Sequence, residues 1–132
     1  MRAAAGCDSI VMVVEDDGGI RESLMEVLED NEYQPIGAAN GKEAIERLRA
    51  LHDRPCVILL DLMMPVMDGR EFRALLLQDA ELGTIPVVIL TAHANLRDAA
   101  EGMAAAACLK KPVQLDVLLQ IVHQFCRPSM AA

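Results

Sequence analysis

The sequence predicts a doubly wound α/β fold, in which a parallel sheet carries helices on both faces. Two patterns alternate along its 132 residues. Short apolar runs are followed by longer stretches in which apolar residues recur every three or four positions. Three of the runs (residues 11–14, 57–60 and 87–90) contain no polar residue, as is typical of central parallel strands. No repeat, low-complexity linker or second domain is visible, so we expect one domain.

The strands are predicted by the apolar runs and by the residues that bound them. We expect them over residues 10–14, 33–38, 56–60, 87–90 and 106–109. Pro35 lies inside the second run and cannot donate a ladder hydrogen bond, so this strand is expected at an edge of the sheet. Pro55 and Pro86 precede the third and fourth runs and break the chain there.

The helices are predicted by one apolar face each and by residues that start or stop a helix. The first apolar stripe begins at Ile20 and ends near residue 30. Asn40, with Glu43 three positions later, is typical of an N-cap and its capping partner. The other helices are expected over residues 69–76, 96–103 and 115–125.

The composition argues against nucleic-acid binding. Lys and Arg number 12 against 20 Asp and Glu, which leaves a formal net charge of −8. Proteins that bind nucleic acid need clustered cations to displace counterions from phosphates. The chain has no Trp, one Tyr and two Phe, so it also lacks aromatic platforms for stacking single-stranded bases.

Membrane insertion and a zinc site are disfavoured as well. The apolar runs are far shorter than the roughly 20 residues of a spanning helix, and the N-terminal residues have no apolar signal-peptide core. Cys7, Cys56, Cys108 and Cys126 are scattered, with no metal-ligand spacing. We therefore expect reduced thiols and a cytoplasmic location.

The polar residues suited to binding or chemistry lie just past the ends of the predicted strands. In a doubly wound sheet, ligands bind at the carboxyl ends of the strands. The residues just past the apolar runs are Glu15, Asp16, Asp17, Asp61, Thr91 and Lys111. A cluster of carboxylates at such an edge favours a hard divalent cation, and carboxylates with water and phosphate are the usual ligands of magnesium. Asp17 alone is better explained as the N-cap of the following helix.

A lysine and a hydroxyl complete a site suited to phosphoryl transfer. The transition state of this reaction places charge on the equatorial oxygens of the phosphoryl group. Mg2+, an ammonium and the Thr91 hydroxyl would surround those oxygens. Lys110 and Lys111 point to opposite faces of a strand, and periodicity alone does not choose between them.

Four segments resemble the signatures of a response-regulator receiver domain. They are VVEDD at 13–17, DLMMPVMDG at 61–69, ILTA at 89–92 and LKKP at 109–112. Their order and spacing fit from about residue 10 to residue 125. The resemblance implies a flavodoxin-like (βα)5 sandwich with strand order 2-1-3-4-5. It further implies a receiver over residues 9–127, with short tails at 1–8 and 128–132.

The resemblance also implies a role for each site residue. Asp61 would accept the phosphoryl group, Thr91 would be the switch hydroxyl, and Lys111 would contact the phosphate. The implied Mg2+ ligands are Glu15, Asp16, Asp61 and the backbone carbonyl of Met63. The donor would be a sensor histidine kinase or phosphotransfer protein. The output would pass to a downstream protein or through a homodimer, and the chain would catalyse at most its own phosphorylation and dephosphorylation.

The chain departs from the family pattern in three places. Cys108 occupies a position that usually holds Tyr or Phe, the segment from Thr91 to Lys111 is about two residues short, and Ala104–Ala105 replaces a Gly-Ala pair. These changes bear on the route from phosphorylation to output. His93, two residues after Thr91, fits either contact with the phosphoryl region or exposure to solvent.

Other interpretations remain open at this stage. The chain is either a stand-alone regulator or a fragment of a larger response regulator or hybrid kinase. An aspartyl-phosphate hydrolase of similar fold needs a second aspartate two residues after the nucleophile, and that residue is Met63. A flavin binder needs a hydroxyl- and glycine-rich phosphate loop, whereas residues 15–17 are acidic and would repel the flavin phosphate.

Overall fold

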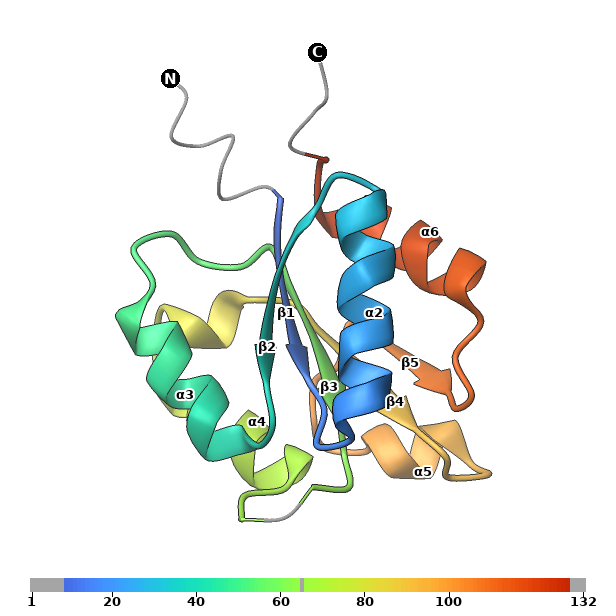
Figure 1. Cartoon of the computed structure of the whole chain (residues 1–132). Coiled ribbons are helices and arrows are strands. Elements are labelled where there is room, and N and C mark those ends of the chain that lie inside the picture. Colours follow the sequence, from blue (N-terminus) through green and yellow to red (C-terminus); the bar gives the residue numbers. More distant parts are fainter. Residues whose placement is uncertain (1–8, 65, 129–132) are drawn as a thin grey trace.

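The computed structural model describes residues 9–64 and 66–128. Its centre is a five-stranded parallel sheet of order β2-β1-β3-β4-β5, which confirms the predicted fold and strand order (Figure 1). The strands are β1 (Ile10–Val14), β2 (Gln34–Ala38), β3 (Val57–Asp61), β4 (Val87–Thr91) and β5 (Ala107–Lys110). The predicted tails, apart from Pro128, lie outside the described residues.

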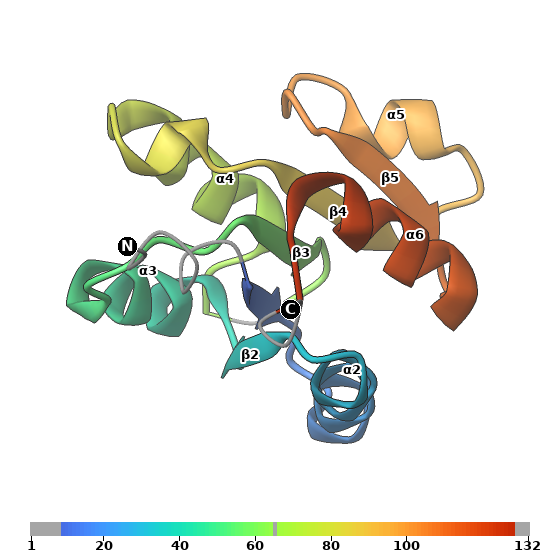
Figure 2. The same ribbon diagram turned by 90° about the horizontal axis from the view of Figure 1, so that it is seen from above.

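Helices cover both faces of the sheet (Figure 2). They are α2 (Gly18–Asp30), α3 (Gly41–Ala50), α4 (Gly69–Gln78), α5 (Leu96–Ala100) and α6 (Leu115–Phe125), with a short 3-10 turn at Leu82–Thr84. Side chains of α3, α4 and α5 share one hydrophobic cluster with the sheet. Those of α2 and α6 share a second cluster on the opposite face.

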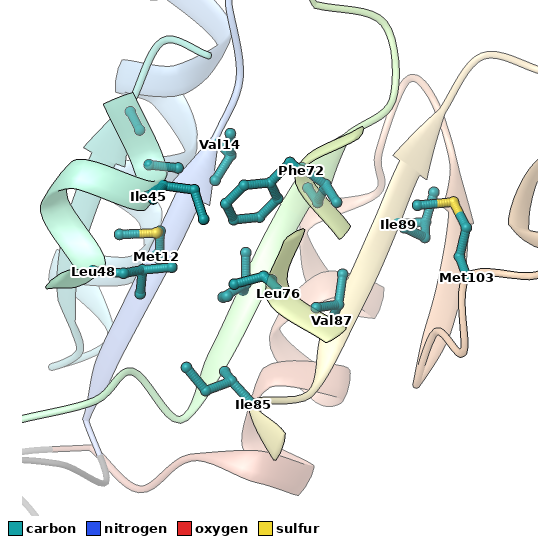
Figure 3. Close-up of a cluster of buried hydrophobic side chains, with 14 of the residues drawn as sticks. Met12, Val14, Ile45, Leu48, Phe72, Leu76, Ile85, Val87, Ile89 and Met103 are labelled. Carbon is teal, nitrogen blue, oxygen red and sulfur yellow. The ribbon is translucent and has the colours of Figure 1, made fainter. Parts of the chain in front are cut away.

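Burial separates the central strands from the edge strands. Every residue of β1, β3 and β4 is buried, which explains why these three runs contain almost only apolar residues. The edge strand β2 tolerates Pro35, as predicted. In the cluster beneath α3 and α4, Phe72 lies among Val14, Ile45 and Leu76 (Figure 3).

The helix boundaries follow from their capping residues. Asp17 accepts a hydrogen bond from the Ile20 amide, so α2 begins two residues before the apolar stripe. Asn40 accepts from the Glu43 amide as predicted. Asp68 forms a capping box with Glu71 at the start of α4.

Helix α5 is shorter than predicted. It ends at Ala100 instead of Met103, because Gly102 has a φ value of 77°, outside the range of a right-handed helix. Gly102 adopts this conformation without a steric cost. The apolar residue Met103 is buried in the core without being helical.

Two arginines of α4 hold this segment. Arg70 donates to the carbonyl oxygens of Asp98, Ala99 and Glu101. Arg73 is 5% exposed and donates to the carbonyls of Met103 and Ala104, and its burial lowers the pKa of its guanidinium. These five hydrogen bonds attach the end of α5 and the loop before β5 to α4.

The prediction of reduced thiols is wrong for two of the four cysteines. Cys56 and Cys126 are 70 residues apart in sequence but form a disulfide. Cys56 lies just before β3 and Cys126 just after α6, and the fold brings their Cα atoms to 5.5 Å. Spacing along the chain could not reveal a pair that only the tertiary fold creates. Cys108 is a free thiol.

Replacing Phe72 with alanine should destabilise the chain strongly. The ring is fully buried, and truncating a buried Phe costs about 3–5 kcal/mol of unfolding free energy. Denaturation followed by circular dichroism measures the change. Leu77→Ala on the same helix is the control, because Leu77 is 48% exposed and should shift the midpoint little. Equal midpoints for the two variants would contradict the assigned core.

Candidate functional site

Neighbouring strands bring three buried polar side chains to one edge of the sheet. Glu15 follows β1, Asp61 ends β3, and Thr91 ends β4. The register places Val14 beside Leu60 and Asp61 beside Leu90, so the three strands end at nearly the same level. Exposure is 1% for Glu15 and 3% each for Asp61 and Thr91. These are most of the buried polar residues among those that the structure describes.

The backbone around the two buried carboxylates is fixed by hydrogen bonds. The Glu15 amide donates to the Ala38 carbonyl at 3.0 Å, and the Arg21 guanidinium donates to the Glu15 carbonyl at 2.7 Å. The Met63 amide lies 3.3 Å from Asp61 Oδ1 and donates to it. A Cβ at Gly69 would lie 2.8 Å from the carbonyl oxygen of Asp61. Glycine is therefore required where α4 approaches the end of β3.

Lys111 links the two carboxylates. Its Nζ lies 2.6 Å from Glu15 Oε1 and 3.3 Å from Asp61 Oδ1. Lys110, the alternative that the sequence left open, is exposed on the last position of β5. The Lys111 amide donates to the Thr91 carbonyl at 2.7 Å, and the peptide bond between Lys111 and Pro112 is cis. The structure thus places Lys111 in the cluster.

The electrostatics of the cluster leave it short of positive charge. Burial raises the pKa of Glu15 to about 7, and the nearby Asp61 carboxylate adds to this rise while Lys111 opposes it. Burial acts to lower the pKa of Lys111, but the hydrogen bond to Glu15 and the charge of Asp61 outweigh it, so the pKa is raised. One ammonium thus faces two buried carboxylates, with Asp16 beside them.

The same cluster offers suitable ligands for a divalent cation. Carboxylate oxygens of Glu15, Asp16 and Asp61 lie within 4.8 Å of one another. Asp16 is exposed, which gives the cation access from solvent. Hard oxygen donors and a net negative charge fit Mg2+. The backbone of Met63 lies next to Asp61, as the predicted role of its carbonyl as a metal ligand requires. Met63 is otherwise 77% exposed.

Thr91 borders a hollow next to the buried carboxylates' end of the sheet. The hollow has a volume of about 490 Å³, and its lining includes Thr91, His93, Met63 and Arg70. The Thr91 Oγ1 accepts a hydrogen bond from the His93 amide at 3.1 Å. The His93 ring is exposed, and its Nδ1 accepts from the Asn95 amide. The His93 backbone therefore contacts the site through Thr91, and His93 is one of the residues that line the hollow.

The sequence did not indicate Arg21 and Arg70 as neighbours of the site. Both donate hydrogen bonds to backbone carbonyls, and no spacing of residues in the sequence predicts such a contact. Asp17, at the same edge, is the helix cap that the sequence favoured.

The sequence of this chain is similar to those of a known protein family. The family model described as the response regulator receiver domain matches residues 11–123. The chain belongs to the response-regulator receiver family. Receivers are signalling domains of two-component systems, they work with histidine kinases, and they are not enzymes in the ordinary sense.

Individual relatives agree with this assignment. Response regulator Rre1 of Synechocystis sp. is 35% identical over 125 residues, which are 92% of this chain and 53% of Rre1. The chain therefore spans about half the length of this relative. The signal receiver domain of a histidine kinase from Syntrophus aciditrophicus is 33% identical, with a TM-score of 0.80 and 89% of each chain covered.

A third relative was solved with a metal. The Mn2+-bound form of response regulator Rcp1 is 31% identical, with a TM-score of 0.70, and the match covers 88% of this receiver and 90% of that chain.

Among the helices of the described residues, none has the length and the apolar character that a membrane-spanning helix needs.

The Mg2+ affinity of this receiver should fall as the pH falls through 7. The pKa of Glu15 is raised to about 7, so below this pH the metal must displace a proton. Between about pH 8 and about pH 6, we expect the dissociation constant to rise about tenfold. Calorimetry in buffers of different ionisation enthalpy measures affinity and proton release together, and suits a chain without Trp.

Two variants control this measurement. Glu15→Gln should bind Mg2+ more weakly and lose the pH dependence in this range. Asp16→Asn should bind more weakly but keep it, because Glu15 is unchanged. An affinity of the unaltered chain that stays constant from pH 8 to pH 6 would contradict the role of Glu15.

Proposed function

We propose that Asp61 accepts a phosphoryl group from a phosphohistidine donor, and that Glu15, Asp16, Thr91 and Lys111 assist the transfer. The observation that carries this proposal is the position of Lys111 Nζ, within 3.3 Å of Asp61 and 2.6 Å of Glu15. The ammonium lies beside the carboxylate that reacts and also pairs with Glu15, one of the acidic residues that would hold a cation. Such a placement suits a phosphoryl group on Asp61.

In the proposed reaction an Asp61 carboxylate oxygen attacks phosphorus. The oxygen–phosphorus bond forms as the phosphorus–nitrogen bond to the donor imidazole breaks, and the imidazole leaves neutral because it takes up a proton from solvent. A bound Mg2+ would neutralise charge on the phosphoryl oxygens, with Glu15, Asp16, Asp61 and the Met63 carbonyl holding it. Lys111 would contact one of these oxygens and the Thr91 hydroxyl would donate to another.

We propose that residues 9–127 form the receiver. The catalysis would be limited to the chain's own phosphorylation and dephosphorylation. Met63 stands where a hydrolase would need its acid, which supports a chain that holds the phosphoryl group rather than turning over substrate. The donor would be a sensor histidine kinase or phosphotransfer protein in the cytoplasm. The output would go to a protein partner or second copy, without direct contact between residues 9–127 and nucleic acid.

Asp61→Asn should abolish phosphorylation completely. Asparagine keeps the shape of the side chain but cannot form the acyl phosphate. Intact-mass measurement after incubation with acetyl phosphate and Mg2+ should show the added phosphoryl mass on the unaltered chain and not on the Asp61→Asn variant. Asp17→Asn is the control, since Asp17 lies at the same edge as a helix cap and should still be modified. Phosphoryl mass on the Asp61→Asn variant would overturn the assignment.

The output of this receiver should depend little on residue 108. Cys108 is half-buried on β5, packs against the core below α5 and lies 3.7 Å from the Leu96 carbonyl. A thiol buries much less apolar area than an aromatic ring, so two placements of it differ little in free energy. We infer that Thr91, the loop from residue 92 to residue 95, and Lys111 carry the change instead.

Thiol labelling of Cys108 tests this inference. In a Cys7→Ser chain with the disulfide intact, Cys108 is the remaining free thiol. The labelling rate should be nearly the same with and without beryllofluoride on Asp61, while amide NMR shifts of residues 92–95 should change. A large change in labelling rate with a fixed loop would show that residue 108 is the moving element after all.

A further inference from the structure

The end of the sheet opposite the acceptor site holds a cysteine pair. Cys56 precedes β3 and Cys126 caps the end of α6. Their Cα atoms are 5.5 Å apart, within the usual range for disulfides. The pair thus connects the last turn of α6 to the start of a central strand.

The two sulfur atoms differ in their access to solvent. Cys126 is 4% exposed and belongs to the core cluster under α2 and α6. Cys56 is only partly buried and lines a hollow of about 280 Å³, together with Arg54, Thr84 and Phe125. A small molecule in this hollow would reach Cys56 first.

The backbone around Cys56 suits the reduced as well as the oxidised form. The Cys56 amide donates to the Ile10 carbonyl at 2.9 Å, and this bond does not depend on the sulfur. The Cys56 Sγ lies 3.1 Å from the same carbonyl oxygen, which can accept the proton of a free thiol. Breaking the disulfide therefore leaves no polar group of Cys56 without a partner.

The hollow also carries a positive charge in a fixed position. Arg54 Nη1 donates to the Glu81 carbonyl at 2.9 Å and to Thr84 Oγ1 at 3.3 Å. These contacts hold the guanidinium beside the hollow that Cys56 lines. A guanidinium binds carboxylates well, so the hollow favours a small ligand that carries them.

We propose that Cys56 and Cys126 form a reversible thiol–disulfide couple that exchanges with small, carboxylate-bearing disulfides through Cys56. The oxidised form ties α6 to the start of β3, and the reduced form lacks this covalent tie. Thiols of a cytoplasmic protein are ordinarily kept reduced, so the bond would report an oxidising change.

The exchange proceeds through two successive thiol–disulfide reactions. The Cys56 thiolate attacks one sulfur of the small disulfide, forming a mixed disulfide and releasing one small thiolate. The Cys126 thiolate then attacks the Cys56 sulfur, forming the protein disulfide and releasing the second small thiolate. Each released thiolate takes up a proton that a cysteine has lost. Two protein thiols are oxidised, and one small disulfide is reduced to two thiols.

This couple is separate from the acceptor site and from Cys108. Strand β3 begins just after Cys56 and runs for five residues to Asp61, which is about 16 Å of extended chain. Cys108 lies on β5, and β4 separates β5 from β3. Burial also raises the pKa of the Cys108 thiol, which keeps it protonated and less reactive. The couple should therefore form equally well in Asp61→Asn.

The first experiment measures formation of the bond. The Cys7→Ser chain is reduced, freed of reductant and mixed with oxidised glutathione, then followed by intact mass and peptide mapping. We expect a loss of two hydrogen atoms with residues 56 and 126 joined. The melting temperature should rise by about 10 °C on oxidation, because the bond closes a long loop. A chain that keeps both thiols free under excess oxidised glutathione would overturn the proposal.

The order of attack is tested with single variants. Cys126→Ser should accumulate one glutathione on Cys56, because the second thiol is missing. Cys56→Ser should gain far less, since Cys126 is buried. Cys108→Ser is the matched control and should form the disulfide at the rate of the parent. Faster modification of Cys126 than of Cys56 would contradict entry through the hollow.

The role of Arg54 is tested by changing the charge of the disulfide. Arg54→Gln should slow the reaction with oxidised glutathione several-fold and leave that with neutral hydroxyethyl disulfide unchanged. A merely structural role would slow both reactions or neither, and either result would remove Arg54 from the proposal. Circular dichroism of each reduced variant shows that it is folded before the rates are compared.

Discussion

The complete burial of three central strands is the constraint on which the rest of this molecule depends. Along β1, β3 and β4 every residue is buried, so a polar group in the middle of a strand would lack water and partners. Polar side chains are tolerated only where a strand ends. Glu15, Asp61 and Thr91 occupy those ends, and parallel pairing brings them to one place. The location of the chemistry is thus a consequence of the packing.

Placing two carboxylates in a poorly solvated edge creates a need for positive charge. Lys111 meets part of it through ion pairs with both Glu15 and Asp61. A cation or a phosphoryl group entering the cluster must compete with this ammonium or rearrange it. The backbone amide of Lys111 is hydrogen-bonded to the Thr91 carbonyl. A shift of the lysine backbone would therefore move the ends of β4 and β5. Charge balance at the site and the position of these two strands are therefore coupled.

Most of the fold could be predicted from the sequence, because periodicity and strand burial are local signals. The five strands and the edge position of Pro35 follow from them, and so does the cluster at the strand ends. The choice of Lys111 over Lys110 needed either a family resemblance or the structure, since two adjacent residues differ only in direction. The disulfide, the short α5 and the contacts of Arg70 and Arg73 depend on segments that are distant in sequence and come together only in the folded chain. Such contacts leave no periodic pattern in the sequence.

The attachment of α5 to α4 has an evolutionary consequence. Arg70 and Arg73 bind carbonyl oxygens, which every residue type presents alike. The five-residue α5 and the loop after it are therefore held without demanding particular side chains, apart from the buried Ala99 and Met103 and from Gly102, whose positive φ favours glycine. Their exposed positions are free to diverge, and an insertion or deletion there can be absorbed while the two arginines keep the segment in place. This part of the surface can acquire new partner specificity at little cost to the fold.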